Sequence, residues 1–169
     1  MTIIAEYNEE EQELLRSAIE SAAVAVSAAS PGRSEETVSE GYAAAELVLG
    51  SQPRYVDNTL VTSILAQLYV DIKEGRVFPN YLELATEPGA LQESMIVLGR
   101  VTKLLEAKST PEEAAGYKRW LMEVAQAVAQ AGKEDQGFLG RGGVMVNDAE
   151  RSALESIART LGVEAPAGS

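Results

Sequence analysis

The chain lacks the two side chains on which much protein chemistry depends, because its 169 residues include no histidine and no cysteine. Their absence excludes imidazole bases, thiol nucleophiles, disulfides, and zinc or iron sites built from those ligands. Aromatic residues are also scarce, with two phenylalanines and one tryptophan. The core must therefore be filled mostly by Ala, Val, Leu and Ile, which here favours closely packed helices over a β-sandwich.

Positive charge is scarce as well. The chain has 14 Lys and Arg residues against 26 Asp and Glu residues, a formal net charge of −12. Such a charge repels polyphosphate backbones and anionic lipids, so we expect neither nucleic acid nor a membrane as a partner. The opening MTIIAEYNEEEQ is acidic and does not resemble a signal peptide, which favours a cytoplasmic location.

Helix-start and helix-stop signals, with apolar residues at helical spacing, predict an all-α, single-domain bundle of about six helices over residues 1–169. The clearest starts are capping boxes at Asn8, Thr110 and Asn147. The expected helices run from Asn8 to Ser30, from Ser34 to Gly50, from Asp57 or Asn58 to Glu74, from Leu91 to Ala107, from Thr110 to Gly132 and from Asn147 to Gly162.

The other residues are expected to form connectors and chain ends. Residues 75–90 contain prolines and residues 133–146 are rich in glycine, so we predict two long connectors, the first with one short helical turn. Residues 1–7 and 163–169 are expected to be frayed.

Two hairpins of the chain are alike. The segment IESAAVAVSAAS, a turn and a capped helix ending at Gly50 are similar to MEVAQAVAQAGK, a turn and a capped helix ending at Gly162. A true internal repeat explains this, but so does the shared composition of alanine-rich helices, which is the favoured explanation.

Carboxylates are the residues from which a metal site without histidine could be built. The acidic runs Glu9–Glu11, Glu35–Glu36 and Glu112–Glu113 all fall in expected first helical turns, where acids stabilise the helix dipole. A hydroxyl nucleophile would need a lysine or carboxylate base, and no Ser-x-x-Lys pattern is present. We therefore predict no metal site, no cofactor and no catalytic residue.

The glycine-rich segment Gly137–Gly143 precedes a capped helix start. Its backbone NH groups and Arg141, with Gly142 and Gly143, could contact an anion or a partner. The Gly-Lys-Ser/Thr ending of a phosphate-binding loop is missing, however. A connector with Phe138 and Leu139 in the core is the favoured alternative.

The last part of the chain resembles a group of uncharacterised bacterial all-helical proteins that have no established activity. The resemblance rests on Pro111–Ala115, Tyr117–Leu121, Phe138–Gly140, Gly142–Gly143 and Asn147–Glu150 before Leu154 and Ile157.

Residues 146–163 also resemble the second helix of tellurite-resistance TerB-like domains, which are helical bundles. In those domains an Ala-Asp-Gly turn supplies acidic residues associated with metal binding. This chain has Ser30-Pro31-Gly32 and Gly140-Arg141-Gly142 instead, with no Asp before the glycine. The resemblance therefore implies only an all-helical fold.

Together these observations predict a non-enzymatic bacterial helical protein that acts by binding, in a stress-related or envelope-related system. It would bind a protein partner or form a homodimer. The alternative is a carboxylate-based metal-binding sensor or metal-dependent enzyme. The alternative needs facing carboxylates with perturbed pKa values in a pocket, whereas a binding protein needs an exposed apolar patch or a large symmetric interface.

Overall fold

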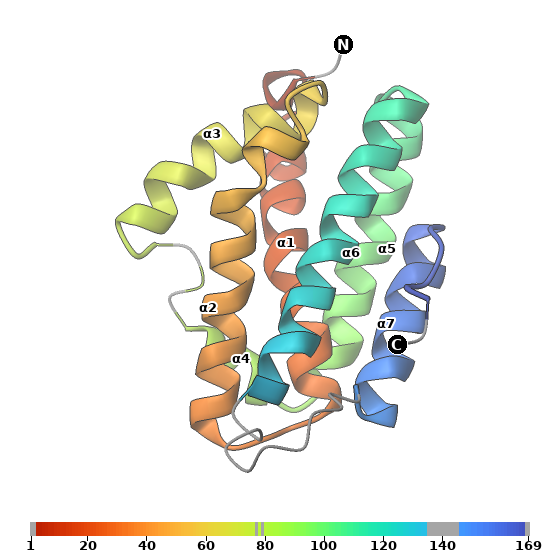
Figure 1. The fold of residues 1–169 in the computed structure, drawn as a ribbon. Helices are drawn as coiled ribbons and strands as arrows, with labels where there is room; N and C mark the ends of the chain where they lie inside the picture. The colour runs from red at the N-terminus through yellow and green to blue at the C-terminus, as the bar shows by residue number, and fades with distance from the viewer. Residues whose placement is uncertain (1–2, 77, 79, 135–145, 168–169) are drawn as a thin grey trace.

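The computed structural model describes residues 3–76, 78, 80–134 and 146–167. All regular structure in these residues is helical, which confirms the predicted all-α bundle (Figure 1). The elements are η1 Ile4–Glu6, α1 Glu9–Ala29, α2 Ser34–Gly50, η2 Gln52–Arg54, α3 Thr59–Lys73, α4 Tyr81–Thr86, α5 Ala90–Lys108, α6 Pro111–Glu134 and α7 Asp148–Leu161.

Helix caps predicted from the sequence are present at the starts of α1 and α7. The Asn8 side chain accepts a hydrogen bond from the Glu11 NH, and the Glu11 carboxylate accepts one from the Asn8 NH, both at 2.9 Å. Asn147 and Glu150 repeat this pair of bonds at 2.9 and 3.2 Å. The exchange satisfies NH groups that a helix start leaves without partners.

The sequence predicts that Ser34, followed by Glu35 and Glu36, caps the second helix, but the cap of α2 lies one residue earlier. Ser34 is the first helical residue rather than the cap, and Arg33 occupies the cap position. The Glu36 carboxylate explains the shift, because it accepts hydrogen bonds from the backbone NH and the guanidinium of Arg33, at 3.1 and 3.0 Å. Glu36 thus satisfies the backbone NH of the cap residue and also pairs with its charge.

Four long helices, α1, α2, α5 and α6, run along the length of the bundle (Figure 1). Helix α1 packs against α4, α5, α6 and α7, and α2 packs mainly against α6. Tyr117 and Trp120 are fully buried on α6. The Trp120 indole NH donates to the Ser51 hydroxyl at 3.0 Å, and the Tyr117 hydroxyl donates to the Leu15 carbonyl. The core therefore lies around α1 and α6.

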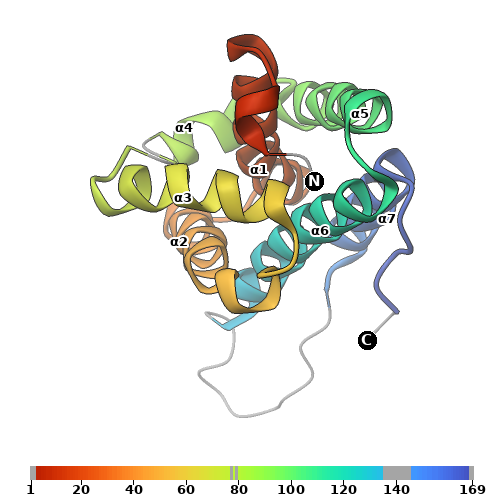
Figure 2. The same cartoon turned by 90° about the horizontal axis from the view of Figure 1, so that it is seen from above.

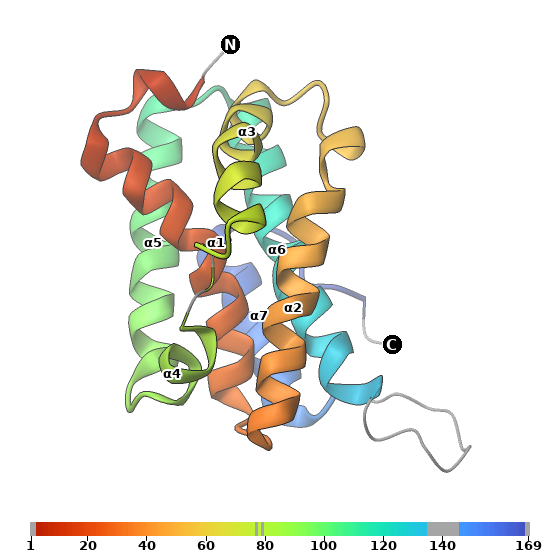
Figure 3. The same cartoon turned by 90° about the vertical axis from the view of Figure 1, so that its left-hand side faces the viewer.

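Helix α3 stands apart from this arrangement. Seen from above, the long helices are viewed nearly end-on while α3 lies across them and extends outward (Figure 2). Figure 3 shows α3 above α4 on one face of the bundle, beside α2. The connector over residues 75–90 contains α4, which confirms the predicted short helical turn.

The first described residues are packed, although we expected residues 1–7 to be frayed. Residues 4–6 form η1, and the side chains of Ile4 and Tyr7 are only 4% and 3% exposed. The Ile4 NH donates to the Ser63 hydroxyl at 3.0 Å, and the Tyr7 and Ser109 hydroxyls are hydrogen-bonded at 2.6 Å. Two buried side chains and two long-range hydrogen bonds therefore hold this segment to α3 and to Ser109 at the end of α5.

Candidate functional site

The glycine-rich segment that the sequence singles out lies outside the described residues. This holds for Arg141, Gly142 and Gly143, the predicted anion or partner contact, and for Phe138 and Leu139. The candidate site described below is therefore built from other parts of the chain.

The acidic runs are placed as helix starts require. Glu9–Glu11, Glu35–Glu36 and Glu112–Glu113 lie in the first turns of α1, α2 and α6. The Thr110 hydroxyl donates to the Glu113 carboxylate at 3.0 Å and accepts from the Glu113 NH at 3.3 Å. Among the residues that the structure describes, no group of three or more acidic side chains could hold a metal ion.

The carboxylate alternative has its best location in a small cavity between α1, α4 and α5. This cavity has a volume of about 160 Å³, and Glu20, Glu87 and Glu93 line it. Burial, with a smaller effect of Glu13, raises the pKa of Glu20. One Glu20 oxygen is buried without a hydrogen-bond partner in the described residues. In the described part of the chain, these three acids do not come together as a group that could hold a metal ion.

An open apolar groove between α2, α3 and α4 is the better candidate. It consists of a cavity of about 630 Å³ and a neighbouring one of about 320 Å³, which share Leu49 and Ile72. We call it the α2/α3 groove. Its lining residues are Val38, Gly41, Tyr42, Ala45, Glu46, Val48, Leu49, Gln52, Thr62, Leu65, Ala66, Tyr69, Ile72, Gly75, Phe78, Asn80, Tyr81, Leu82 and Glu83.

The α2 wall of the groove exists because α2 is apolar on two faces. Its inner face, with Ala44 and Val48, is buried in the bundle. Its outer face carries Val38, Tyr42 and Leu49 at helical spacing, and their side chains are 39%, 70% and 36% exposed. A helix at a protein surface usually has one apolar stripe. The second stripe on α2 therefore needs an explanation.

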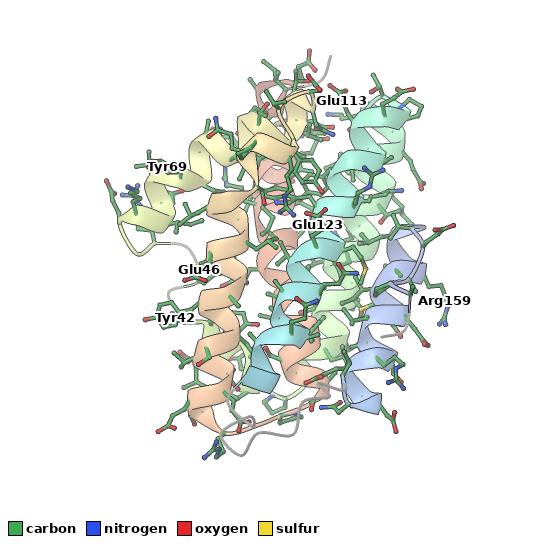
Figure 4. All side chains as sticks on the ribbon, in the orientation of Figure 1. Tyr42, Glu46, Tyr69, Glu113, Glu123 and Arg159 are labelled. Atoms are coloured by element: carbon green, nitrogen blue, oxygen red, sulfur yellow. The ribbon has the colours of Figure 1, made fainter. Side chains whose placement is uncertain are left out.

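The α3 wall has a matching stripe. Leu65, Tyr69 and Ile72 follow each other at helical spacing on α3 and line the groove. Helix α3 leans away from α2, and Tyr42 and Glu46 project from α2 into the space below α3 (Figure 4). No described helix fills this space, and Val38, Tyr42 and Leu49 of α2 and Tyr69 of α3 are exposed there, while Leu65 lies buried at its base.

Tyr81 of α4 closes the groove on the bundle side. Its ring packs directly on Gly41 of α2, where an added Cβ would lie 2.7 Å from the ring carbon Cδ1. Its hydroxyl is hydrogen-bonded to the Ser27 hydroxyl of α1 at 2.8 Å, and Ser27 in turn donates to the Glu40 carboxylate of α2. Since Ser27 has a single hydrogen to donate, Tyr81 is the donor to Ser27 in this arrangement. The chain of bonds ties α1, α2 and α4 together beneath the groove.

Glu40 is an unusual residue for an interior, because its side chain is only 6% exposed. Its pKa is raised to about 7, chiefly by burial and to a smaller extent by the nearby Glu150 and Glu36 carboxylates, while the hydrogen bond from Ser27 opposes this rise. A serine beside a carboxylate is the pairing that a hydroxyl nucleophile would need here. Ser27 and Tyr81 are themselves 4% and 5% exposed, so no substrate reaches this pair.

The sequence contained a signal for Glu40 that periodicity alone could have revealed. Glu40 is three residues after Thr37 and four before Ala44, both of which are buried. It therefore occupies the inner stripe of α2, and an acid in that stripe must find a partner inside the protein.

The charged residues in the groove lining are all acidic. The lining contains two acidic side chains, Glu46 and Glu83. Among the described residues, no Lys or Arg lines the groove. The groove is thus apolar with an acidic edge.

No protein-family model, no curated protein and no solved structure matches this chain. The resemblances drawn from the sequence stay predictions. No helix in the described part of the chain combines the length and apolarity that crossing a bilayer requires.

Proposed function

We propose that this protein is a non-enzymatic binding protein that holds an apolar segment of a protein partner in the α2/α3 groove. The observation that carries the proposal is the outer stripe of α2, where Val38, Tyr42 and Leu49 are exposed opposite a second apolar stripe on α3. Contiguous exposed apolar surface with a polar edge is typical of interaction sites. Such a protein would work in the bacterial cytoplasm, in the stress-related or envelope-related setting that the sequence predicts.

The dimensions of the groove suit a short segment. From Val38 to Leu49 the α2 wall is about 17 Å long, since a helix rises about 1.5 Å per residue. Tyr42 and Tyr69, which are 70% and 50% exposed, offer two aromatic side chains to a partner. Exposed tyrosines in apolar surroundings contribute strongly to binding at protein interfaces.

A selection with random peptides tests this proposal. Displayed peptides of about 16 residues, roughly 24 Å as a helix, are selected on the folded protein. They are then measured against Tyr42→Asp, in the groove, and against Ile96→Asp. Ile96 is a matched control because it is 56% exposed on α5 and is not a groove residue.

We expect selected peptides that lose at least about tenfold in affinity on Tyr42→Asp and keep their affinity on Ile96→Asp. The proposal is wrong if the selection returns no binding peptides, or if both variants weaken binding equally. Circular dichroism of both variants checks that their helix content is unchanged.

A further inference from the structure

We infer that the occupant of the α2/α3 groove is an amphipathic helix whose apolar stripe is flanked by Lys or Arg. This inference rests on the proposed function and names the chemistry of the partner. It follows from two independent features of the groove, the hydrogen-bonding capacity of its walls and the charge of its edge.

The walls favour a helix over an extended segment. An extended peptide leaves its backbone NH and carbonyl groups without partners unless it pairs with a strand edge, and the described residues contain no strand. The backbones of α2 and α3 are already paired within their own helices. A helix satisfies its own backbone, so it can enter an apolar groove without burying unpaired polar groups.

The stripes on the walls have the spacing that a third helix would match. Residues that line the groove recur every three or four positions on both walls. They are Val38, Tyr42, Ala45 and Leu49 on α2 and Leu65, Tyr69 and Ile72 on α3. Two diverging helices with such stripes leave room for the ridge of a third one.

The edge of the groove selects for positive charge. Glu46 and Glu83 are exposed, and neither carboxylate forms a salt bridge within the described residues. The nearby cations at the end of α3 and just after it are engaged by the chain itself. Arg76 pairs with Asp71 at 2.7 Å, and the Lys73 ammonium lies 5.0 Å from the centre of the Tyr69 ring. Basic residues of a partner would therefore find two unpaired acids.

A second copy of this chain fits the groove poorly for the same reason. Pairing two such faces would bring Glu46 and Glu83 of one copy toward the same acids of the other. Each copy also carries a net charge of −12, so long-range repulsion opposes their encounter. The partner is thus a different protein with a basic amphipathic segment.

The peptides whose binding depends on Tyr42 provide the test, because their sequences are read directly. We expect an excess of Lys and Arg over Asp and Glu, apolar residues at helical spacing, and little proline. Groove-binding peptides that are acidic, neutral or proline-rich would overturn this inference and leave the proposed function standing. A selection with no Tyr42-dependent peptide would overturn both.

Charge reversal then tests the role of the two acids. The double variant Glu46→Lys/Glu83→Lys should weaken the best basic peptide about tenfold at low salt and less at high salt. The matched control is Asp57→Lys/Glu155→Lys, which changes the net charge equally at two exposed acids outside the groove. Equal weakening by both double variants would show that only overall charge matters and would contradict the inference.

Discussion

Helices α1 and α2 are both rich in apolar residues, yet other helices pack around α1 whereas one face of α2 is open to solvent. Residues 22–27 of α1 are consecutively buried, because α4, α5, α6 and α7 pack around that helix. Helix α2 is covered on its inner face, while Val38 and Tyr42 remain exposed on its outer face. The chain thus encloses this part of α1 on all sides. The outer face of α2 is open because α3 extends outward instead of packing along it.

The largest difference between the two helices should appear when one apolar side chain is removed from each. Ile19 on α1 is 1% exposed, and Ile19→Ala should lower the free energy of unfolding by about 4 kcal/mol. Leu49 on α2 is 36% exposed, and Leu49→Ala should cost less than about 1 kcal/mol. Urea denaturation measures both values, and similar losses would contradict the distinction between a closed and an open helix.

The acid beneath the groove should make stability depend on pH. The pKa of Glu40 is about 7 in the folded protein, against 4.5 as the ordinary value. Between these values the folded state holds a proton that the unfolded state has lost, so stability falls as pH rises from about 4.5 to about 7. Glu40 alone accounts for roughly 3 kcal/mol of this fall.

Glu40→Gln isolates this effect, because the amide keeps a hydrogen-bond acceptor for Ser27. Other groups that titrate, such as Glu20, affect the wild type and the variant alike. The free energy of unfolding of the variant minus that of the wild type should therefore increase by about 3 kcal/mol as the pH is raised from 4.5 to 8. A difference between the two proteins that is constant with pH would contradict the buried-acid explanation.

A smaller effect is expected where α4 rests on α2. Gly41→Ala places a methyl group 2.7 Å from the Tyr81 ring, so it should cost about 1 kcal/mol after the gain in helix propensity is subtracted. Gly50→Ala is the matched control, since an added Cβ there meets nothing within 4 Å. Thermal unfolding should show a loss for the first variant and none for the second. Equal stabilisation by both would mean that Tyr81 does not pack on Gly41.

The smallest stability effect should come from the outer face of α2. Tyr42 is 70% exposed, so Tyr42→Ser should change the free energy of unfolding by no more than about 0.5 kcal/mol. The same variant should weaken binding of groove-selected peptides by about tenfold, measured by fluorescence anisotropy. A large loss of stability would instead assign Tyr42 to the core.

The helices were predictable because their signals are local. Asn8 and Asn147 are each followed three residues later by the glutamate that completes the cap, and Gly162 has the left-handed conformation that ends α7, with φ of 68°. The packing of Ile4 was missed because its partners, such as Ser63, are distant in the sequence.

The groove was not predicted, because it depends on the direction of α3 relative to α2. That direction is set by tertiary contacts, and helical periodicity does not encode it. The α2 wall of the groove could nevertheless have been found in the sequence. Val38, Tyr42 and Leu49 form a second apolar stripe on α2, in addition to the stripe with Ala44 and Val48. A helix with two apolar stripes must bury both or offer one to a partner.

Amide NMR spectra of the isotope-labelled protein, recorded during titration with the tightest-binding basic peptide, test the central claim most directly. The account predicts chemical-shift changes concentrated in residues 38–49 of α2, residues 62–72 of α3 and α4. Changes concentrated instead on α5 and α7, with those three segments unaffected, would contradict it.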